Sequence, residues 1–194
     1  MQKRVEETMN DIDIKNLAGK FLIAVPGLKD PNFERTIVLI CDHTNDGAFG
    51  LVINRILLNS FVPFLRWLDI RKSMIDLPVF YGGPVKPDQG CMLYVPENSN
   101  YTSIKVSDGL ALTTTKEILV DVAAGKGPNK FLFALGYAGW AAGQLEYELM
   151  IDSWLIAPLD KKFIFDIPVS ERWMSAADLI GVDLNRFFHR QGQA

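Results

Sequence analysis

Residues 17–54 read LAGKFLIAVPGLKDPNFERTIVLICDHTNDGAFGLVIN. Three apolar runs occupy residues 21–25, 36–41 and 48–53, and turn-forming or polar residues separate them. Short runs rich in β-branched residues and bounded by Pro, Gly and Asn are typical of β-strands. We predict that the second and third runs form a hairpin closed by a loop of about five residues. The polar residues at the strand ends are where a functional site would form.

Outside this stretch, apolar runs, helix caps and glycine stops predict further strands and helices. Ser60 is a suitable N-cap for a helix that continues to about residue 68, and Thr115 precedes a helix that stops before Gly125. Asp108-Gly109 favours a two-residue hairpin turn. The helix after Thr115 is predicted to span residues 116–123, with further helices at residues 141–150 and 170–180. Further strands are predicted at residues 77–81, 90–95, 103–106, 110–113, 130–135, 154–157 and 163–165.

These elements predict one α+β domain, in which three to four helices pack against a largely antiparallel sheet. The chain has 194 residues, of which 48% are hydrophobic and 22% are charged, so it is long enough to bury a sizeable core. Residues 1–16 carry both charge signs without a clear apolar face. They are predicted to form an N-terminal arm, and residues 17–194 the single domain.

The composition favours a cytoplasmic protein that associates with neither membranes nor nucleic acid. No apolar run approaches the length of a bilayer span, and the N-terminus is too polar for a secretory signal. Cys41 and Cys91 each lie inside an apolar run, which is typical of buried free thiols. The net charge is −3 and no run of like charge exceeds two residues, whereas duplex binding needs clustered basic residues.

The sequence Cys41-Asp42-His43 closes a predicted strand and brings together a thiol, a carboxylate and an imidazole. Side chains alternate along a strand, so Cys41 and His43 are expected to share one face while Asp42 points to the other. A nucleophile and base on one face would fit a thiol enzyme. We favour the interpretation that Cys41 is a buried structural residue beside a turn-forming histidine, because catalytic Cys–His partners normally come from separate segments.

Two other segments are candidate binding sites. The glycine-rich residues 136–143, GYAGWAAG, follow a predicted strand and open a predicted helix, where backbone amides can hold phosphate. Their spacing fits neither dinucleotide nor P-loop motifs, so close packing of strand and helix is favoured. Glu148 and Asp152 share a helix face that could hold a hard cation, but solvated carboxylates are the commoner case. We therefore expect no cofactor and no metal.

Longer segments carry a family resemblance. Residues 17–183 contain, in order, GKFLIAVPGLKDPNFERTIVLICDH, GAFGLVIN, YGGPV, LGYAGWAAGQLEYEL, SWLIAP and RWMSAADLIGVD. In these segments the chain resembles the YqgE/AlgH family of uncharacterised bacterial proteins. The resemblance implies a compact α/β architecture with a curved, barrel-like sheet flanked by helices, and it supplies no accepted catalytic motif.

One branch of that family bears a transcriptional-regulator label. The chain itself shows neither a helix-turn-helix pattern nor a basic stripe. It departs from the family pattern at two places. Arg55-Ile56 stands where members often have Lys-Pro, and Asp42 stands where Glu usually precedes the histidine.

The leading hypothesis is a non-enzymatic cytoplasmic protein that binds a small ligand or a protein partner, with a regulatory role. The first alternative is a transcriptional regulator that contacts DNA, and the second is a hydrolase or thiol enzyme that uses Cys41 and His43. The candidate ligand-binding residues combine glycines at strand ends with polar and aromatic side chains: His43, Asn54, Gly82, Gly83, Trp140, Gln144 and Glu146.

Overall fold

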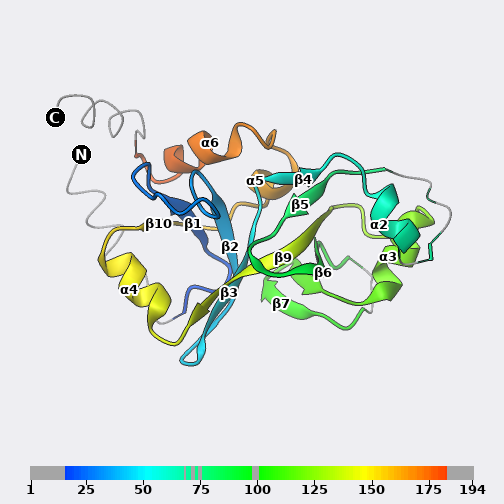
Figure 1. Cartoon of the computed structure of the whole chain (residues 1–194), viewed down its shortest axis with the longest axis horizontal. Coiled ribbons are helices and arrows are strands. Elements are labelled where there is room, and N and C mark those ends of the chain that lie inside the picture. The colour runs from blue at the N-terminus through cyan, green and yellow to red at the C-terminus, as the bar shows by residue number, and fades with distance from the viewer. Residues whose placement is uncertain (1–15, 68, 71–72, 74–75, 98–100, 183–194) are drawn as a thin grey trace.

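The computed structural model of the protein describes residues 16–67, 69–70, 73, 76–97 and 101–182. Within these residues, strands and helices combine into one α+β domain (Figure 1). In chain order they are β1 (Phe21–Ala24), β2 (Ile37–Thr44), β3 (Gly47–Val52), β4 (Ile56–Leu58), α2 (Val62–Trp67), β5 (Val79–Tyr81), β6 (Val85–Tyr94), β7 (Ile104–Ser107), β8 (Leu110–Thr113), α3 (Lys116–Ala123), β9 (Phe131–Ala141), α4 (Gln144–Met150), β10 (Trp154–Ala157), α5 (Lys161–Phe165) and α6 (Arg172–Asp178).

The strands form one sheet with the order β10-β1-β2-β3-β9-β6-β8-β7, and β4 and β5 join it beside β9. All pairings are antiparallel except that of β5 with β9. The predicted α+β class with a largely antiparallel sheet is confirmed. The described strands curve without closing, and the curvature brings β7 close to the start of β1. A Cβ on Gly19 would lie 3.1 Å from the carbonyl oxygen of Val106.

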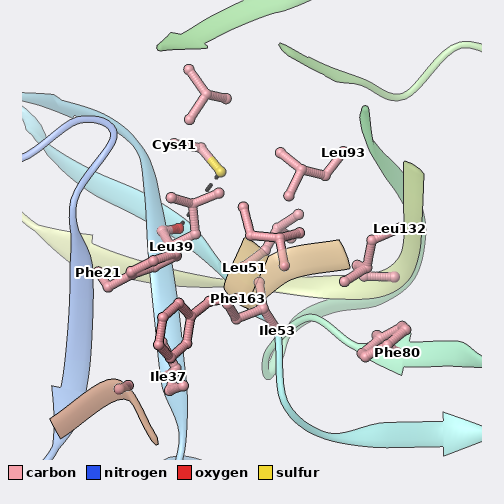
Figure 2. Packing of buried hydrophobic residues seen from close by; sticks show 14 of the residues in the cluster. Phe21, Ile37, Leu39, Cys41, Leu51, Ile53, Phe80, Leu93, Leu132 and Phe163 are labelled. Carbon is pink, nitrogen blue, oxygen red and sulfur yellow. Dashed lines mark hydrogen bonds between the residues drawn. The ribbon is translucent and has the colours of Figure 1, made fainter. Parts of the chain in front are cut away.

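Three hydrophobic clusters stabilise the fold. The central core lies inside the curve of the sheet and contains Phe21, Leu39, Leu51, Leu93 and Phe163 among others (Figure 2). Trp173 also belongs to it. The α4 core contains Leu22, Val52, Trp140, Leu145 and Trp154, and the α2–α3 core contains Phe61, Leu65, Met92, Ile118 and Val122. The helices therefore cover different parts of one continuous sheet.

Strand β9 contributes to all three cores. It runs through the middle of the molecule (Figure 1) and pairs with β6 along one edge and with β3 and β5 along the other. Leu132 and Ala134 point into the central core, Ala138 and Trp140 into the α4 core, and Phe133 into the α2–α3 core. The predicted strand at residues 130–135 is therefore only the first half of a longer one.

Two predictions of secondary structure in the C-terminal third are wrong. Most of the glycine-rich segment 136–143 is strand, because β9 continues to Ala141, and helix α4 begins only at Gln144. The predicted strand at residues 163–165 instead lies in helix α5. The Asp160 carboxylate accepts a hydrogen bond from the Lys162 N–H at 2.9 Å, which caps this helix.

Two turns and caps also differ from prediction. The β2–β3 loop has two residues rather than about five, because Thr44 pairs with Gly47. The N–H of Phe61, at the start of α2, donates to the Asp76 carboxylate at 2.9 Å, while the Ser60 hydroxyl donates to the same carboxylate. Asp76, from a separate segment, therefore takes the capping role assigned to Ser60.

Helix α3 has the predicted bounds, 116–123. Residues 1–15 of the predicted arm and residue 68, the predicted helix end, lie outside the described residues. The division into an arm and a domain stays a prediction. In the described part of the chain, no helix combines the length and apolar character needed to cross a membrane.

Candidate functional site

A β-bulge in β2 determines which side chains face the two sides of the sheet. Between Ile40 and Asp42, β2 has one residue more than β3, and that residue is Cys41. An extra residue interrupts the alternation of side chains. Cys41 consequently lies in the central core, whereas His43 pairs with Ala48 of the α4 core. The expectation that Cys41 and His43 share a face is wrong.

Both cysteines are buried free thiols. The Cys41 thiol points into the central core and donates to the Leu39 carbonyl oxygen at 3.6 Å (Figure 2). Cys41 is 1% exposed and Cys91 is 2% exposed. Burial raises the pKa of the Cys41 thiol above its usual range and raises the pKa of Cys91 to about 11. Neither thiol has the exposed, electropositive surroundings of a nucleophile.

His43 and Glu146 form a polar link between β2 and α4. The His43 side chain is only 2% exposed. The Leu17 N–H donates to Nδ1 at 3.1 Å, so that this nitrogen carries no proton. Nε2 therefore carries the proton and donates to Oε1 of Glu146 at 2.9 Å. The imidazole is thus held from both sides, which makes it an orienting group within the fold.

Next to this link, the Glu148 carboxylate accepts three hydrogen bonds. Oε2 accepts from the indole nitrogens of Trp140 and Trp154, each at 2.8 Å, and Oε1 accepts from Nε2 of Gln144 at 2.9 Å. The protein itself satisfies this carboxylate, which speaks against the cation site considered for Glu148 and Asp152. Four of the predicted residues, His43, Trp140, Gln144 and Glu146, therefore gather around α4.

The other three predicted residues lie elsewhere and have structural contacts. Oδ1 of Asn54 accepts from the Ile37 N–H at 2.8 Å and its Nδ2 donates to the Arg35 carbonyl at 2.9 Å, which fastens the loop before β2. Gly82 and Gly83 pack against β9, where added Cβ atoms would lie 2.1 Å and 2.2 Å from backbone atoms. These glycines allow two backbones to approach closely. Ligand binding by the predicted residues stays a prediction.

A groove of about 630 Å³ opens at one end of the curved sheet, bordering the central core. Its floor is a row of cross-strand neighbours, in which Asp42 of β2 pairs with Phe49 of β3 and Phe49 pairs with Gly139 of β9. The rings of Phe49 and Tyr137 meet edge to face with centroids 6.0 Å apart. A Cβ on Gly139 would lie 3.5 Å from the Tyr137 ring, so a small side chain there would make ordinary contacts with the floor.

The walls of the groove come from segments that are far apart in sequence. Four residues of β6, 86–89, bulge out opposite Gly136, and this bulge supplies Lys86 and Gln89. Ile104 of β7 and Leu112 of β8 add apolar surface. Bulges often place side chains at functional sites. Trp140 borders this groove as well as belonging to the set around α4.

Sequence reasoning did not select the aromatic floor of the groove. Phe49 and Tyr137 each sit among small residues, in AFG and GYAG, which was the available signal. Their convergence depends on the pairing of β3 with β9, which no local spacing indicates.

Comparison with known proteins identifies the family to which this chain belongs. A family model described as AlgH-like matches residues 21–185, most of the chain. The chain belongs to the AlgH-like family. Among AlgH-like relatives, a UPF0301 protein of Methylococcus capsulatus is 46% identical over 179 residues, covering 91% of this chain and 95% of the relative. A UPF0301 protein of Hahella chejuensis is 44% identical and covers 93% of this chain and 98% of that one.

The AlgH-like fold is also seen in solved structures. The solution structure of the AlgH protein from Pseudomonas aeruginosa matches with a TM-score of 0.76 and 37% identity, covering 95% of this chain and 99% of that chain. A crystal structure of a Corynebacterium diphtheriae protein, 18% identical, matches with a TM-score of 0.59 over 90% of this chain and 86% of that one, a likeness of fold. The resemblance to the YqgE/AlgH family is confirmed.

Proposed function

We propose that this protein is a non-enzymatic cytoplasmic binding protein whose small ligand occupies the groove at the open end of the sheet. The observation that carries the proposal is the groove itself. Its volume of about 630 Å³ lies within the range of about 300–1,000 Å³ that is usual for small-ligand pockets. An apolar floor with a few charged side chains at its border is the common composition of such sites.

The groove offers poor conditions for nucleophilic catalysis. Cys91 is the thiol that borders it, and its burial and its raised pKa oppose thiolate formation. Cys41 and His43 lie on opposite sides of the sheet, which speaks against the Cys41–His43 enzyme. The burial of both thiols and the separation of Cys41 from His43 therefore favour ligand binding over thiol catalysis.

The residues around α4 support the groove from the opposite side of the sheet. His43 and Asp42 are consecutive, so the hydrogen bonds that hold His43 also hold the backbone that presents Asp42 to the groove. Trp140, fixed by Glu148, sits next to Gly139 of the floor. In this proposal His43, Trp140, Gln144 and Glu146 hold the site in position, and Asn54, Gly82 and Gly83 stabilise neighbouring strands.

A thermal-shift panel of metabolites, nucleotides, divalent metals and short duplex DNA tests the proposal. A ligand at 100 times its Kd stabilises a protein by about 2.7 kcal/mol, which corresponds to a Tm rise of roughly 5–10 °C at this size. Gly139→Leu should fill the groove and remove the rise. Gly139→Ala is the matched control, because its Cβ would make only ordinary contacts.

Three outcomes are informative. A rise in the parent protein that Gly139→Leu removes and Gly139→Ala retains supports the groove. A flat panel, or a rise that survives Gly139→Leu, contradicts it. A response to DNA that disappears with added salt would favour the transcriptional regulator instead, because phosphate contacts release counterions.

A further inference from the structure

The charged side chains of the groove are distributed unevenly. Asp42 faces the groove from β2, and Asp46 lies in the β2–β3 turn beside it. Lys86 lies on the β6 bulge and is the groove's basic side chain. Two carboxylates against one ammonium give the lining a formal charge of −1. Within the described part of the chain, none of the three forms an ion pair.

The apolar surface lies directly beside the carboxylate of β2. Asp42 is the cross-strand neighbour of Phe49, so both side chains stand on the same face of the sheet. Phe49 meets Tyr137 edge to face, and Gly139 lines the groove opposite Phe49 on β9. A planar group that enters this space would contact two aromatic rings, while a donor attached to it would reach the Asp42 carboxylate.

We propose that the groove binds a cationic amphipathic small molecule, in which an ammonium group is joined by a short chain to a planar apolar ring. This inference rests on the proposed function of the groove. The ring would pack on Phe49 and Tyr137 in the offset or edge-to-face arrangements that aromatic groups prefer. The ammonium would pair with the Asp42 and Asp46 carboxylates, neither of which forms an ion pair with another described residue.

The size of the groove favours a small molecule over a macromolecular partner. A standard protein interface buries about 800 Å² per partner over a broad area. The groove has a volume of about 630 Å³, within the range usual for small-ligand pockets. Its width is limited by the β2–β3 turn on one side and by the β6 bulge on the other.

Titration with tryptamine and indole-3-propionate, followed by 1H–15N NMR of the full chain, tests the inference. The two probes share a ring and differ in the sign of their charge. We expect tryptamine to shift the amide signals of Phe49, Tyr137 and Gly139, with a Kd at least tenfold lower than that of the propionate. Added NaCl should raise the tryptamine Kd, because exposed charges are screened.

Variants isolate the role of the carboxylates. Asp42→Asn with Asp46→Asn should raise the tryptamine Kd about fivefold to tenfold, in line with the modest strength of exposed ion pairs. Asp152→Asn removes one negative charge beyond the far end of α4, where Asn tolerates the left-handed backbone (φ 55°), and should leave the Kd unchanged.

Each contrary outcome has a distinct meaning. Preference for the propionate, or a Kd unaffected by Asp42→Asn with Asp46→Asn, overturns the cationic ligand while the groove remains a binding site. Absence of shifts with either probe also overturns it. The proposed function would still stand if a panel ligand were blocked by Gly139→Leu. A decapeptide with alternating lysine and phenylalanine that bound tenfold tighter than tryptamine would assign the groove to a peptide instead.

Discussion

At the scale of single residues, Glu148 joins two buried indoles to helix α4. Trp140 and Trp154, whose indole nitrogens both donate to its Oε2, are 6% and 3% exposed. Phe33 stacks on Trp140 with centroids 6.1 Å apart and meets Trp154 edge-on at 5.6 Å. The carboxylate thus sits at the polar border of an aromatic cluster.

Glu148→Ala should lower the free energy of unfolding by about 2–6 kcal/mol, because two buried N–H donors lose their acceptor at about 1–3 kcal/mol each. Glu148→Gln keeps one acceptor oxygen and should lose less. Urea denaturation followed by tryptophan fluorescence measures both variants. Equal stability of Glu148→Ala and the parent would show that water replaces the carboxylate at no cost.

The two thiols should be unreactive while the protein is folded. A pKa of about 11, as for Cys91, leaves about 100-fold less thiolate near neutral pH than the usual value of 9.0, and burial also limits access. We expect iodoacetamide to label the native protein at least about 100-fold more slowly than the guanidinium-unfolded protein. Rapid native labelling of Cys41 would reopen the thiol-enzyme alternative.

The site shows the limits of sequence reasoning at this scale. Seven residues were selected by their type and by their position at strand ends, and four of them meet around α4. The contact between His43 and Glu146 spans 103 residues, and no spacing rule could have assigned it. The groove was missed for a related reason, since its aromatic floor forms only once β3 and β9 pair.

At the scale of elements, helix α2 depends on a cap from outside itself. The Asp76 carboxylate accepts hydrogen bonds from the Phe61 N–H and the Ser60 hydroxyl. The hydrogen bond from Ser60 is the largest cause of the lowered pKa of Asp76. Desolvation opposes it by raising the pKa, and hydrogen bonds from backbone N–H groups lower the pKa further. A carboxyl group whose pKa is lower in the folded state than in the unfolded state stabilises the protein at pH values above the unfolded-state pKa. This stabilisation is lost as the pH falls toward the folded-state pKa.

Asp76→Asn should therefore lower the urea midpoint at neutral pH. The difference from the parent protein should persist down to the ordinary pKa of 3.8 and shrink as the pH falls below it. Parallel urea titrations at several pH values measure the effect. A difference that stays constant through the acid range would show that the carboxylate charge has no part in the cap.

The close approach of β5 to β9 should tolerate no side chain at Gly82. An added Cβ would lie 2.1 Å from the Gly136 carbonyl oxygen, so Gly82→Ala should cost about 3 kcal/mol through backbone displacement. Gly143→Ala is the control. It has open space and a φ of 73°, so only the left-handed backbone opposes it, at about 1–2 kcal/mol. Chemical denaturation of both variants ranks them, and equal costs would contradict the tight approach.

Local signals predicted the elements that depend on local chemistry. Thr115 and Gly125 enclose α3 as expected, and Asp108-Gly109 forms the β7–β8 turn. Prediction was wrong where distant contacts prevail. The segment 161–165 has aromatic and β-branched residues typical of strands, yet its Asp160 cap and its position over the central core make it helical. The glycine-rich segment 136–143 was expected to join a strand to a helix, but pairing on both edges continues β9 to Ala141.

At the scale of the whole molecule, β9 links the three hydrophobic cores. Its side chains enter all of them. The first and last strands of the described chain, β1 and β10, pair with each other, with Phe21 opposite Ala157. Unfolding of β9 would expose part of each core, so the three cores are expected to unfold together.

We therefore expect one cooperative unfolding transition. Tryptophan fluorescence reports on Trp140 and Trp154 in the α4 core and on Trp173 in the central core, whereas far-UV circular dichroism reports on the whole sheet. Their urea midpoints should coincide, as two-state unfolding requires. Separate midpoints would show that one core melts before the others.

The bulge in β2 also bears on how the length of this strand can vary. Deleting one residue from a regular strand reverses every side chain beyond the deletion, because the alternation has a period of two. Here the ladder already skips Cys41, with Asp42 opposite Phe49 and His43 opposite Ala48. A chain lacking Cys41 would keep both of those pairings. β2 can thus shorten by one residue while the groove keeps its carboxylate and the opposite side keeps its imidazole.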